Sequence, residues 1–151
     1  MNQLLHVSAS PHIKDRVTTS SIMLDVIIAL IPATLFGIIQ FKINALLIIV
    51  TTITTCVLAE YLYERFMKKT ITIKDLSAVV TGLILALNLP STVPLWLPVI
   101  GGLFAIIVVK QFYGGLGQNF MNPALAARCF LLISFTGRMT NFVFDGMTSS
   151  T

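Results

Sequence analysis

The chain has 151 residues, of which 56% belong to the hydrophobic types and only 11% are charged, and its mean hydropathy is +0.90. Soluble domains carry about 25% charged residues, and a chain of this length has too little interior to bury so much apolar surface. The net charge of +4 rests on ten Lys and Arg spread over short loops, which excludes the concentrated basic surface of a nucleic-acid-binding protein. We therefore expect an all-α, polytopic membrane protein whose solvent is the lipid bilayer.

The first predicted elements are two full-length spans after a polar N-terminal segment, 1–20. Ser21–Phe41 is long enough to cross a hydrocarbon core of about 30 Å and contains one charge, Asp25. No small-residue cleavage site follows it, so we expect an anchored helix instead of a removed signal peptide. Lys42 is a predicted hinge before the second span, Ile43–Tyr61. The far interface of that span is marked by polar and aromatic residues, namely Glu60, Tyr61, Tyr63, Glu64 and Arg65.

Three further apolar segments follow. Leu76–Asn88 begins after a candidate N-cap, Asp75, and the last segment runs from Asn122-Pro123 to Phe135. Both are short, which predicts broken or re-entrant helices of the kind that line binding sites in transporters; the alternative is that loop residues extend them to full length. The segment between them, Val93–Val109, contains Pro94, Pro98, Gly101 and Gly102 and is expected to be kinked. The chain thus has about five transmembrane or half-membrane helices.

The loop charges predict the topology. The loop 65–74 is the most basic stretch of the chain, with Arg65, Lys68, Lys69 and Lys74, whereas the turns at Lys42 and Pro90 are almost uncharged. The positive-inside rule then places the N-terminus in the cytoplasm and the residues after the fifth crossing on the outer face. The chain divides into a cytoplasmic segment, 1–20, a helical bundle, 21–137, and an outer-face loop, 138–151.

Most residue types that carry chemistry are absent or isolated. There is no hydrolytic triad and no dinucleotide fingerprint, and His6 and His12 have no ligand partners, so we expect no catalytic residue and no metal site. Cys56 and Cys129 lie in apolar runs and are interpreted as packing residues. The run Gly114–Gly117 lacks the Lys-Ser/Thr end of a phosphate loop and is interpreted as a tight turn at a close helix approach.

Two charges within predicted spans are candidate functional residues, because such charges are costly in a bilayer. Asp25 is an ion-pathway candidate, although one turn of helix would let it reach the cytoplasmic interface. Arg128 lies deeper. It is a candidate to clamp an anion or cofactor phosphate, or else to pair with Asp25 or with the carbonyl end of a half-helix.

The tail, Asp145-Gly146-Met147-Thr148-Ser149-Ser150-Thr151, has by itself the composition of a polar loop. The whole chain, however, resembles the D subunit of the Rnf complex, which is related to the B subunit of the sodium-pumping NADH:quinone reductase. The resemblance rests on several stretches together. They are Ser10-Pro11-His12, the stretch from Asp75 to Leu83, Leu85-Ala86-Leu87-Asn88-Leu89-Pro90, the stretch from Gly114 to Asn119, and the stretch from Met121 to Arg128. The short N-terminal segment favours the Rnf branch.

The resemblance implies a membrane subunit of an ion-translocating oxidoreductase that carries FMN, joined through its phosphate to a threonine hydroxyl in a motif like Asp-Gly-x-Thr/Ser-Ser/Gly-Ala-Thr. Thr151 takes the position of that threonine, and Asp145, Gly146, Thr148 and Ser149 match the motif, whereas Ser150 replaces the usual alanine. It also implies a flavin transferase that acts outside the cytoplasm and a second, non-covalent flavin such as riboflavin. The implied partners are other Rnf subunits, one of them also flavin-bearing. The implied location is the cytoplasmic membrane of a bacterium or archaeon.

The same resemblance implies a longer polypeptide, because family members have further helices after the flavin threonine. We therefore expect this chain to be the N-terminal half of such a subunit. Two alternatives remain open from the residues. One is a channel or permease half without a redox cofactor, and the other is a scaffold subunit that binds neighbouring membrane helices. The quinone-reductase B subunit is the alternative within the family.

Overall fold

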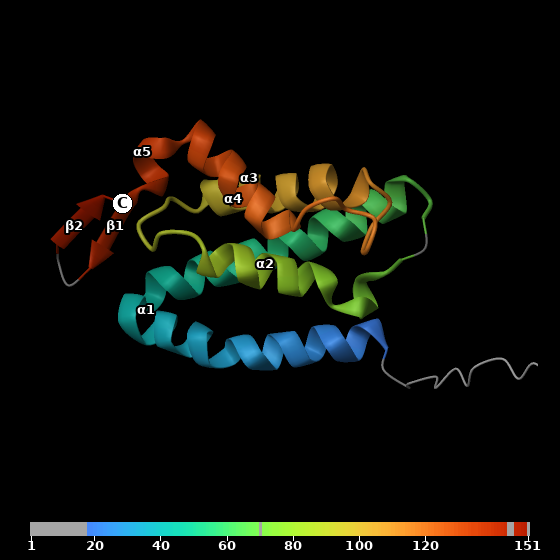
Figure 1. The fold of residues 1–151 in the computed structure, drawn as a ribbon, viewed down its shortest axis with the longest axis horizontal. Coiled ribbons are helices and arrows are strands. Elements are labelled where there is room, and N and C mark those ends of the chain that lie inside the picture. Colours follow the sequence, from blue (N-terminus) through green and yellow to red (C-terminus); the bar gives the residue numbers. More distant parts are fainter. Residues whose placement is uncertain (1–17, 70, 145–146, 151) are drawn as a thin grey trace, which may run out of the picture.

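The computed structural model describes residues 18–69, 71–144 and 147–150. Its first element, α1 (Thr19–Phe66), consists of two helical limbs that fold back on each other (Figure 1). Lys42 makes the turn with φ of 53° and ψ of −134°, outside the helical region. The predicted hinge at Lys42 is therefore confirmed, and the helices on its two sides are the two predicted spans. At about 1.5 Å per residue, each limb is about 35 Å long.

The elements after α1 are η1 (Ile73–Asp75), α2 (Ser77–Leu87), α3 (Trp96–Leu103), the π-helical continuation η2 (Phe104–Gln111), α4 (Pro123–Ser134), α5 (Thr136–Met139), β1 (Asn141–Phe144) and β2 (Met147–Ser150). The helical segments α2, α3 with η2, and α4 alternate in direction along the limbs of α1, and α5 and the hairpin of β1 and β2 lie at one end (Figure 1). Ser20 Oγ donates to the carbonyl of Lys74 (3.2 Å), which places the start of α1 beside the loop 65–74. We call this the basic-loop end. Thr92 Oγ1 donates to the carbonyl of Asn141 (2.7 Å), which places the loop 88–95 beside β1 at the opposite end, the hairpin end.

The short helix α2 is at the centre of the packing and contacts α1, α3 and α4. Its closest approach is at Gly82, where an added Cβ would lie 2.8 Å from the Cα atom of Ile53. Leu85 on α2, Leu97 on α3 and Leu131 on α4 are fully buried around it. The core is thus built by small residues that let backbones meet and by leucines that fill the remaining space.

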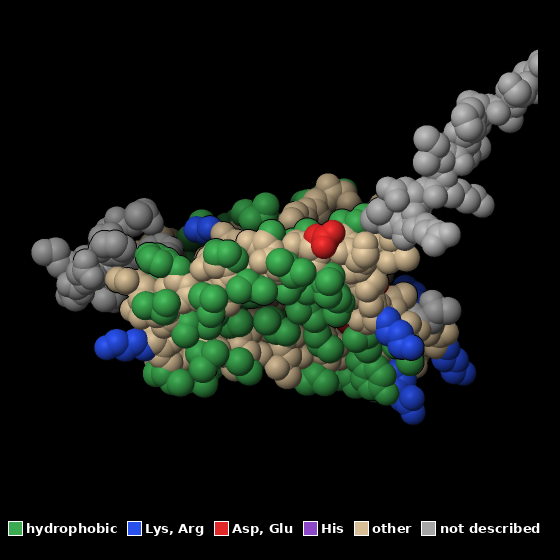
Figure 2. All heavy atoms as spheres, turned by 90° about the horizontal axis from the view of Figure 1, so that it is seen from below, with side chains coloured by type: hydrophobic (Ala, Val, Ile, Leu, Met, Phe, Trp, Pro, Cys, Tyr) green, Lys and Arg blue, Asp and Glu red, His purple; other side chains and the backbone are tan. Residues whose placement is uncertain are grey.

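The surface of the bundle is apolar. Within the described residues, α1 alone is long and apolar enough to cross a membrane, with a mean hydropathy of 2.5 over its most apolar window, none of which is buried. The helices Ser77–Leu87, Trp96–Gln111 and Pro123–Ser134 are apolar but shorter. The face shown in Figure 2 is hydrophobic over its middle, and Lys and Arg gather toward its two ends. This is the distribution of a protein that is solvated by lipid around its middle and by water at its ends.

Local signals in the sequence agree with most helix boundaries. Asn122 caps α4, because its Oδ1 accepts from the backbone N–H groups of Ala124 (3.0 Å) and Leu125 (3.4 Å), and Pro123 is the first helical residue, as predicted. The predicted N-cap of α2, Asp75, is wrong by one residue. The N-cap is Leu76, whose φ is 62°. Asp75 precedes the N-cap, and its Oδ1 accepts a hydrogen bond from the backbone N–H of Ser77 (2.9 Å).

The irregular fourth segment and the glycine turn also differ in detail from expectation. Pro94 precedes α3, and Pro98 lies in the first turn of that helix. It changes from α to π geometry at Phe104. Gly114, Gly115 and Gly117 all have positive φ, which confirms the tight turn. Close helix approach, however, occurs at Gly82 and at Gly101, whereas an added Cβ at Gly115 or Gly117 would meet nothing within 4 Å.

Candidate functional site

The segment 138–151, expected as a loop, contains the end of α5 and two antiparallel strands. The run Asn141–Phe144 is rich in β-favouring residues, and it pairs with Met147–Ser150 in the register Asn141↔Ser150 to Phe144↔Met147. The hairpin is anchored at its base by the hydrogen bond from Thr92. The part of the candidate flavin motif that the structure describes, Met147–Ser150, thus belongs to a small sheet that is attached to the end of the helical bundle.

Two of the predicted site residues can be placed on this sheet. Thr148 pairs with Val143, and Ser149 pairs with Phe142. Asp145 and Gly146, which connect the strands, and Thr151, which follows β2, lie outside the described residues. The structure therefore positions the strand that leads to Thr151 at the hairpin end.

Arg128 faces the end of a short helix. Its Nη1 donates to Oδ1 of Asn88 (2.7 Å), and Asn88, the C-cap residue of α2, donates from Nδ2 to the carbonyl of Ile84 (2.7 Å). A cation beside a helix C-terminus is stabilised by the carbonyl dipoles there. The structure thus brings Arg128 to the end of a half-helix, through Asn88, which is one of the partners that the sequence left open.

Asp25 is an exposed residue of the first limb of α1. Within the described part of the chain it has no ion pair, and the structure does not bring it to Arg128. It lies in the second turn of α1, close to Ser20, whose hydrogen bond to Lys74 places this part of the helix at the basic-loop end. Asp25 and the flavin motif are therefore separate features.

A second cation and an aromatic ring flank the base of the hairpin, and neither was predicted from the sequence. Arg138, in α5, lies over the ring of Trp96 at 5.6 Å from its centroid, and Phe135 packs edge-on against the same ring at 5.2 Å. A signal for them was present in the sequence, because an Arg, a Trp and a Phe near span ends are typical of a membrane interface. Arg138 is exposed and lies in the turn of helix just before β1.

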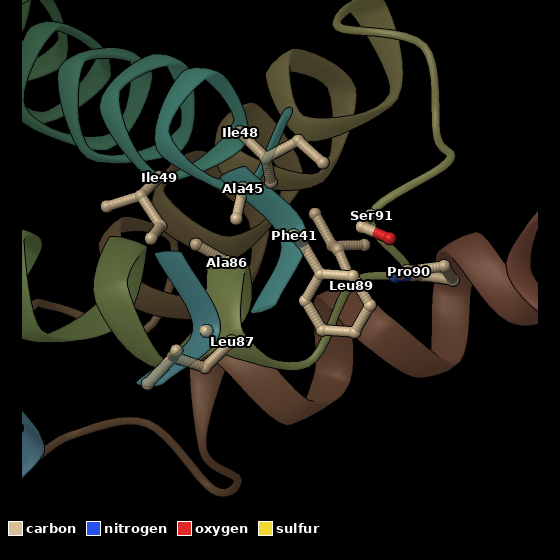
Figure 3. A pocket seen from close by; sticks show the side chains of 10 residues that line it. Phe41, Ala45, Ile48, Ile49, Ala86, Leu87, Leu89, Pro90 and Ser91 are labelled. Atoms are coloured by element: carbon tan, nitrogen blue, oxygen red, sulfur yellow. The ribbon is translucent and has the colours of Figure 1, made fainter. Parts of the chain in front are cut away.

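One pocket near this end of the bundle is apolar and small. It lies between the limbs of α1 and the end of α2, and Phe41, Ala45, Ile48, Ile49, Ala86, Leu87, Leu89, Pro90 and Ser91 are labelled around it in Figure 3. Its volume is about 160 Å³, below the 300–1,000 Å³ that is usual for sites of drug-sized ligands. It contains no cationic side chain for a phosphate, so it does not fit a flavin nucleotide.

A buried polar cluster at the basic-loop end is the largest feature that the sequence did not predict. Lys110 Nζ donates to Glu60 Oε1 (2.6 Å) and to Ser77 Oγ (2.5 Å), and Gln111 Nε2 donates to the same Glu60 oxygen (3.1 Å). Glu60 is 0% exposed and Lys110 is 2% exposed. Removal of one partner from a buried pair of this kind costs about 3–5 kcal/mol, because the other charge is left uncompensated.

The sequence predicted Glu60 at the membrane interface and Lys110 just after the fourth span. In the structure both side chains are buried and paired with each other. The π geometry of η2 extends that helix to Gln111, past the predicted end at Val109, and turns both Lys110 and Gln111 toward the second limb of α1. π segments are frequent at functional sites. The signal in the sequence was the polar pair itself at the end of an apolar run.

The cysteines are not part of either site. Cys56 is buried among Ala59, Ala78 and Ile106, which confirms its packing role, whereas Cys129 is exposed. Among the described residues there is no group of three or more His, Cys, Asp or Glu side chains that fits a metal ion.

Together, the apolar exterior, the helical bundle and the polar features at its two ends define the class of a membrane-embedded helical protein. Residues 6–151 match the model of the NQR2, RnfD, RnfE family. The chain belongs to this family.

Three curated relatives carry similar names. The chain is 49% identical over 99% of its length to the D subunit of the Na(+)-translocating ferredoxin:NAD(+) oxidoreductase complex of Acetobacterium woodii, of which it covers 48%. It is 43% identical over 90% of its length to the D subunit of the proton-translocating ferredoxin:NAD(+) oxidoreductase complex of Clostridium ljungdahlii, covering 41%. It is 42% identical over 91% of its length to the D subunit of the ion-translocating oxidoreductase complex of Shewanella denitrificans, covering 40%. The chain spans about half the length of the curated relatives it matches, or less.

Proposed function

We propose that this chain belongs to a D-type subunit of an Rnf complex, in which FMN bound to Thr151 carries electrons between ferredoxin and NAD and the electron flow drives sodium or proton transport. The similarity over nearly the whole chain to relatives named as D subunits of such complexes carries the proposal. It also favours the Rnf branch over the quinone-reductase alternative, since the names of these relatives refer to ferredoxin:NAD(+) or ion-translocating oxidoreductase complexes.

The proposed attachment needs only a hydroxyl and a fixed position. The Thr151 oxygen forms an ester with the FMN phosphate, formally with loss of water, and the isoalloxazine ring stays chemically free to accept and release electrons. The strand β2 leads to Thr151, and the hairpin is held to the loop 88–95. Arg138 and Arg128 are the basic residues of the last two helices, and they are the candidates to approach the flavin phosphate.

The experiment that tests attachment is mass spectrometry of the tail peptide from the purified full-length complex. We expect a mass increase equal to FMN less water, located on Thr151, and a fluorescent subunit band that survives denaturation. An unmodified Thr151 in active, fully assembled complex would refute the proposal.

The proposed orientation places the basic-loop end in the cytoplasm and the hairpin end outside. The separation of Lys74 and Asn141 at opposite ends of the bundle supports it, together with the basic residues of the loop 65–74. We expect a reporter fused near Lys69 to read cytoplasmic and one fused near Asn141 to read external. A cytoplasmic signal from the Asn141 fusion would contradict both this orientation and flavin transfer outside the cytoplasm.

A further inference from the structure

The second strand of the hairpin runs back to the helical bundle. Ser150, the last residue of β2, pairs with Asn141, the first residue of β1, and α5 ends just before Asn141. Thr92 Oγ1 donates to the carbonyl of Asn141 (2.7 Å), which joins this base of the hairpin to the loop that precedes α3. The chain therefore leaves β2 toward Thr151 beside the end of α5 and the loop before α3, at the hairpin end (Figure 1).

An aromatic ring and a cation meet at the same place. Trp96 is the first residue of α3, and Arg138 belongs to α5. The Arg138 guanidinium lies over the Trp96 ring, 5.6 Å from its centroid, and Phe135 packs edge-on against that ring at 5.2 Å. The two contacts restrict the orientation of the ring, yet Trp96 is still 42% exposed. A flat apolar surface is thus held open near the base of the hairpin.

The Arg138 guanidinium keeps its N–H donors free. It is exposed, and within the described residues its side chain has no hydrogen bond and no ion pair. A planar guanidinium binds a phosphate group through paired donors, so Arg138 fits a phosphate that is brought to the base of the hairpin. The acidic residues that the structure describes lie at the opposite, basic-loop end; they are Asp25, Glu60, Glu64 and Asp75.

Arg128 differs from Arg138 in this respect. Its Nη1 donates to Asn88 Oδ1 (2.7 Å), and its side chain is partly buried between α4 and α2. A phosphate at Arg128 would compete with this contact, whereas a phosphate at Arg138 displaces no hydrogen bond among the described residues. Of the two basic residues in the last two helices, Arg138 is therefore the better phosphate ligand.

We propose that Trp96 and Arg138 form a platform that positions the tethered flavin. Arg138 pairs with the phosphodiester that joins FMN to the chain, and the exposed part of the Trp96 ring packs against the isoalloxazine ring. The inference rests on the proposed attachment of FMN to Thr151 and names the residues that orient it. Both are positioning residues, because they hold the flavin against the end of the bundle and take part in no covalent change.

A lipid headgroup offers the same phosphate chemistry. Arg and Trp near span ends are typical of a membrane interface, so the phosphate that Arg138 meets could belong to a phospholipid. The two sources are separated by measuring the flavin itself, first in a detergent with a sugar headgroup, which carries no phosphate, and then in phospholipid vesicles.

The test uses the purified full-length complex and the fluorescence of the flavin on Thr151. Each variant is paired with the same variant carrying Thr151→Ala, so that the difference between the two complexes is the signal of this flavin alone. Signals are divided by the amount of FMN found on the tail peptide by mass spectrometry. This division separates the position of the flavin from the extent of its attachment.

Trp96→Phe should raise the fluorescence yield several-fold, because indole in contact with an excited flavin quenches it by electron transfer and a phenyl ring does so far less. Trp96→Tyr should remain largely quenched, since the phenol is also electron-rich. Phenylalanine and tyrosine pack alike apart from one hydroxyl, so a merely structural role of Trp96 predicts the same yield for both variants.

Arg138→Gln should lower the fluorescence anisotropy of the flavin in detergent as well as in vesicles, because the phosphodiester is no longer held. Arg138→Lys should restore part of the anisotropy, since lysine keeps the charge but lacks the planar fork. Lys42→Gln is the matched control and should change neither signal. Lys42 is also an exposed cation, and it lies in the turn between the limbs of α1, which is at the same end of the bundle.

The platform requires both effects. An unchanged yield in Trp96→Phe, or an unchanged anisotropy in Arg138→Gln, in complexes that carry FMN on Thr151 would overturn it while the proposed function stands. An Arg138 effect that is seen only in phospholipid vesicles would assign the guanidinium to lipid headgroups and overturn it as well. If the Trp96 variants do not assemble, the Arg138 series decides alone. Absence of FMN from the wild-type tail peptide would refute the proposed function instead.

Discussion

Thr151→Ala in the full-length complex is expected to abolish covalent FMN on this subunit and to reduce ferredoxin-dependent NAD reduction to background. The hydroxyl oxygen is the atom that forms the phosphoester, and alanine offers no substitute for it. Thr151→Ser retains a hydroxyl and should keep part of the flavin. The readouts are the mass of the tail peptide and the fluorescence of the denatured polypeptide, with membrane insertion confirmed by its amount in the membrane fraction.

Thr148→Ala is the matched control, since Thr148 lies in β2 and belongs to the motif but is not the proposed attachment residue. It should lower the extent of flavinylation without moving the site, and Asp145→Ala should do the same. Loss of the FMN mass in Thr148→Ala together with its retention in Thr151→Ala would reassign the attachment residue.

The second large effect is expected at Gly82. Its added Cβ would lie 2.8 Å from the Cα and 3.2 Å from the backbone nitrogen of Ile53, and 3.3 Å from the carbonyl oxygen of Thr52. All three are backbone atoms, so α2 and α1 must separate to accept a methyl group. We expect Gly82→Ala to lower the free energy of unfolding by about 1–3 kcal/mol, and Gly82→Val to lower it further.

Gly37→Ala is the matched control, because Gly37 is also helical but has nothing within 4 Å of its added Cβ. There the better helix propensity of alanine should leave stability unchanged or raise it by up to about 1 kcal/mol. Thermal unfolding of the detergent-solubilised complex measures both variants. Equal midpoints for Gly82→Ala and Gly37→Ala would show that the two helices are not in close contact at Gly82.

The features that the sequence predicted correctly are those that depend on neighbouring residues. The hinge at Lys42 follows from a single cation between two apolar runs, and the start of α4 follows from the Asn122-Pro123 pair. The brevity of α2 and α4 follows from where their apolar runs end. Such signals lie within a few residues of the boundary that they mark.

The features that were missed depend on contacts between distant parts of the chain. Glu60 and Lys110 meet only because α2 and η2 both pack on the second limb of α1 and because η2 has π geometry, which apolar periodicity does not reveal. The contact of Arg128 with Asn88 likewise needs the packing of α4 on α2. The hairpin was missed because its strands are short and its second strand consists mostly of small polar residues, whose composition is typical of a loop.

The shortness of α2 and α4 has an electrical consequence. At about 1.5 Å per residue, α2 is about 16 Å long and α4 about 18 Å, and the two pack against each other. A transmembrane voltage of 100 mV does work of about 2.3 kcal/mol on each unit charge that crosses, whatever the thickness of the insulating layer. Where these two helices alone separate the two aqueous sides, the voltage would fall over about 17 Å instead of about 30 Å, and the field strength would be about 1.8 times higher. A charge between these two helices, such as the Arg128 guanidinium at the end of α2, would there respond to the voltage more strongly than the same charge in an ordinary bilayer span.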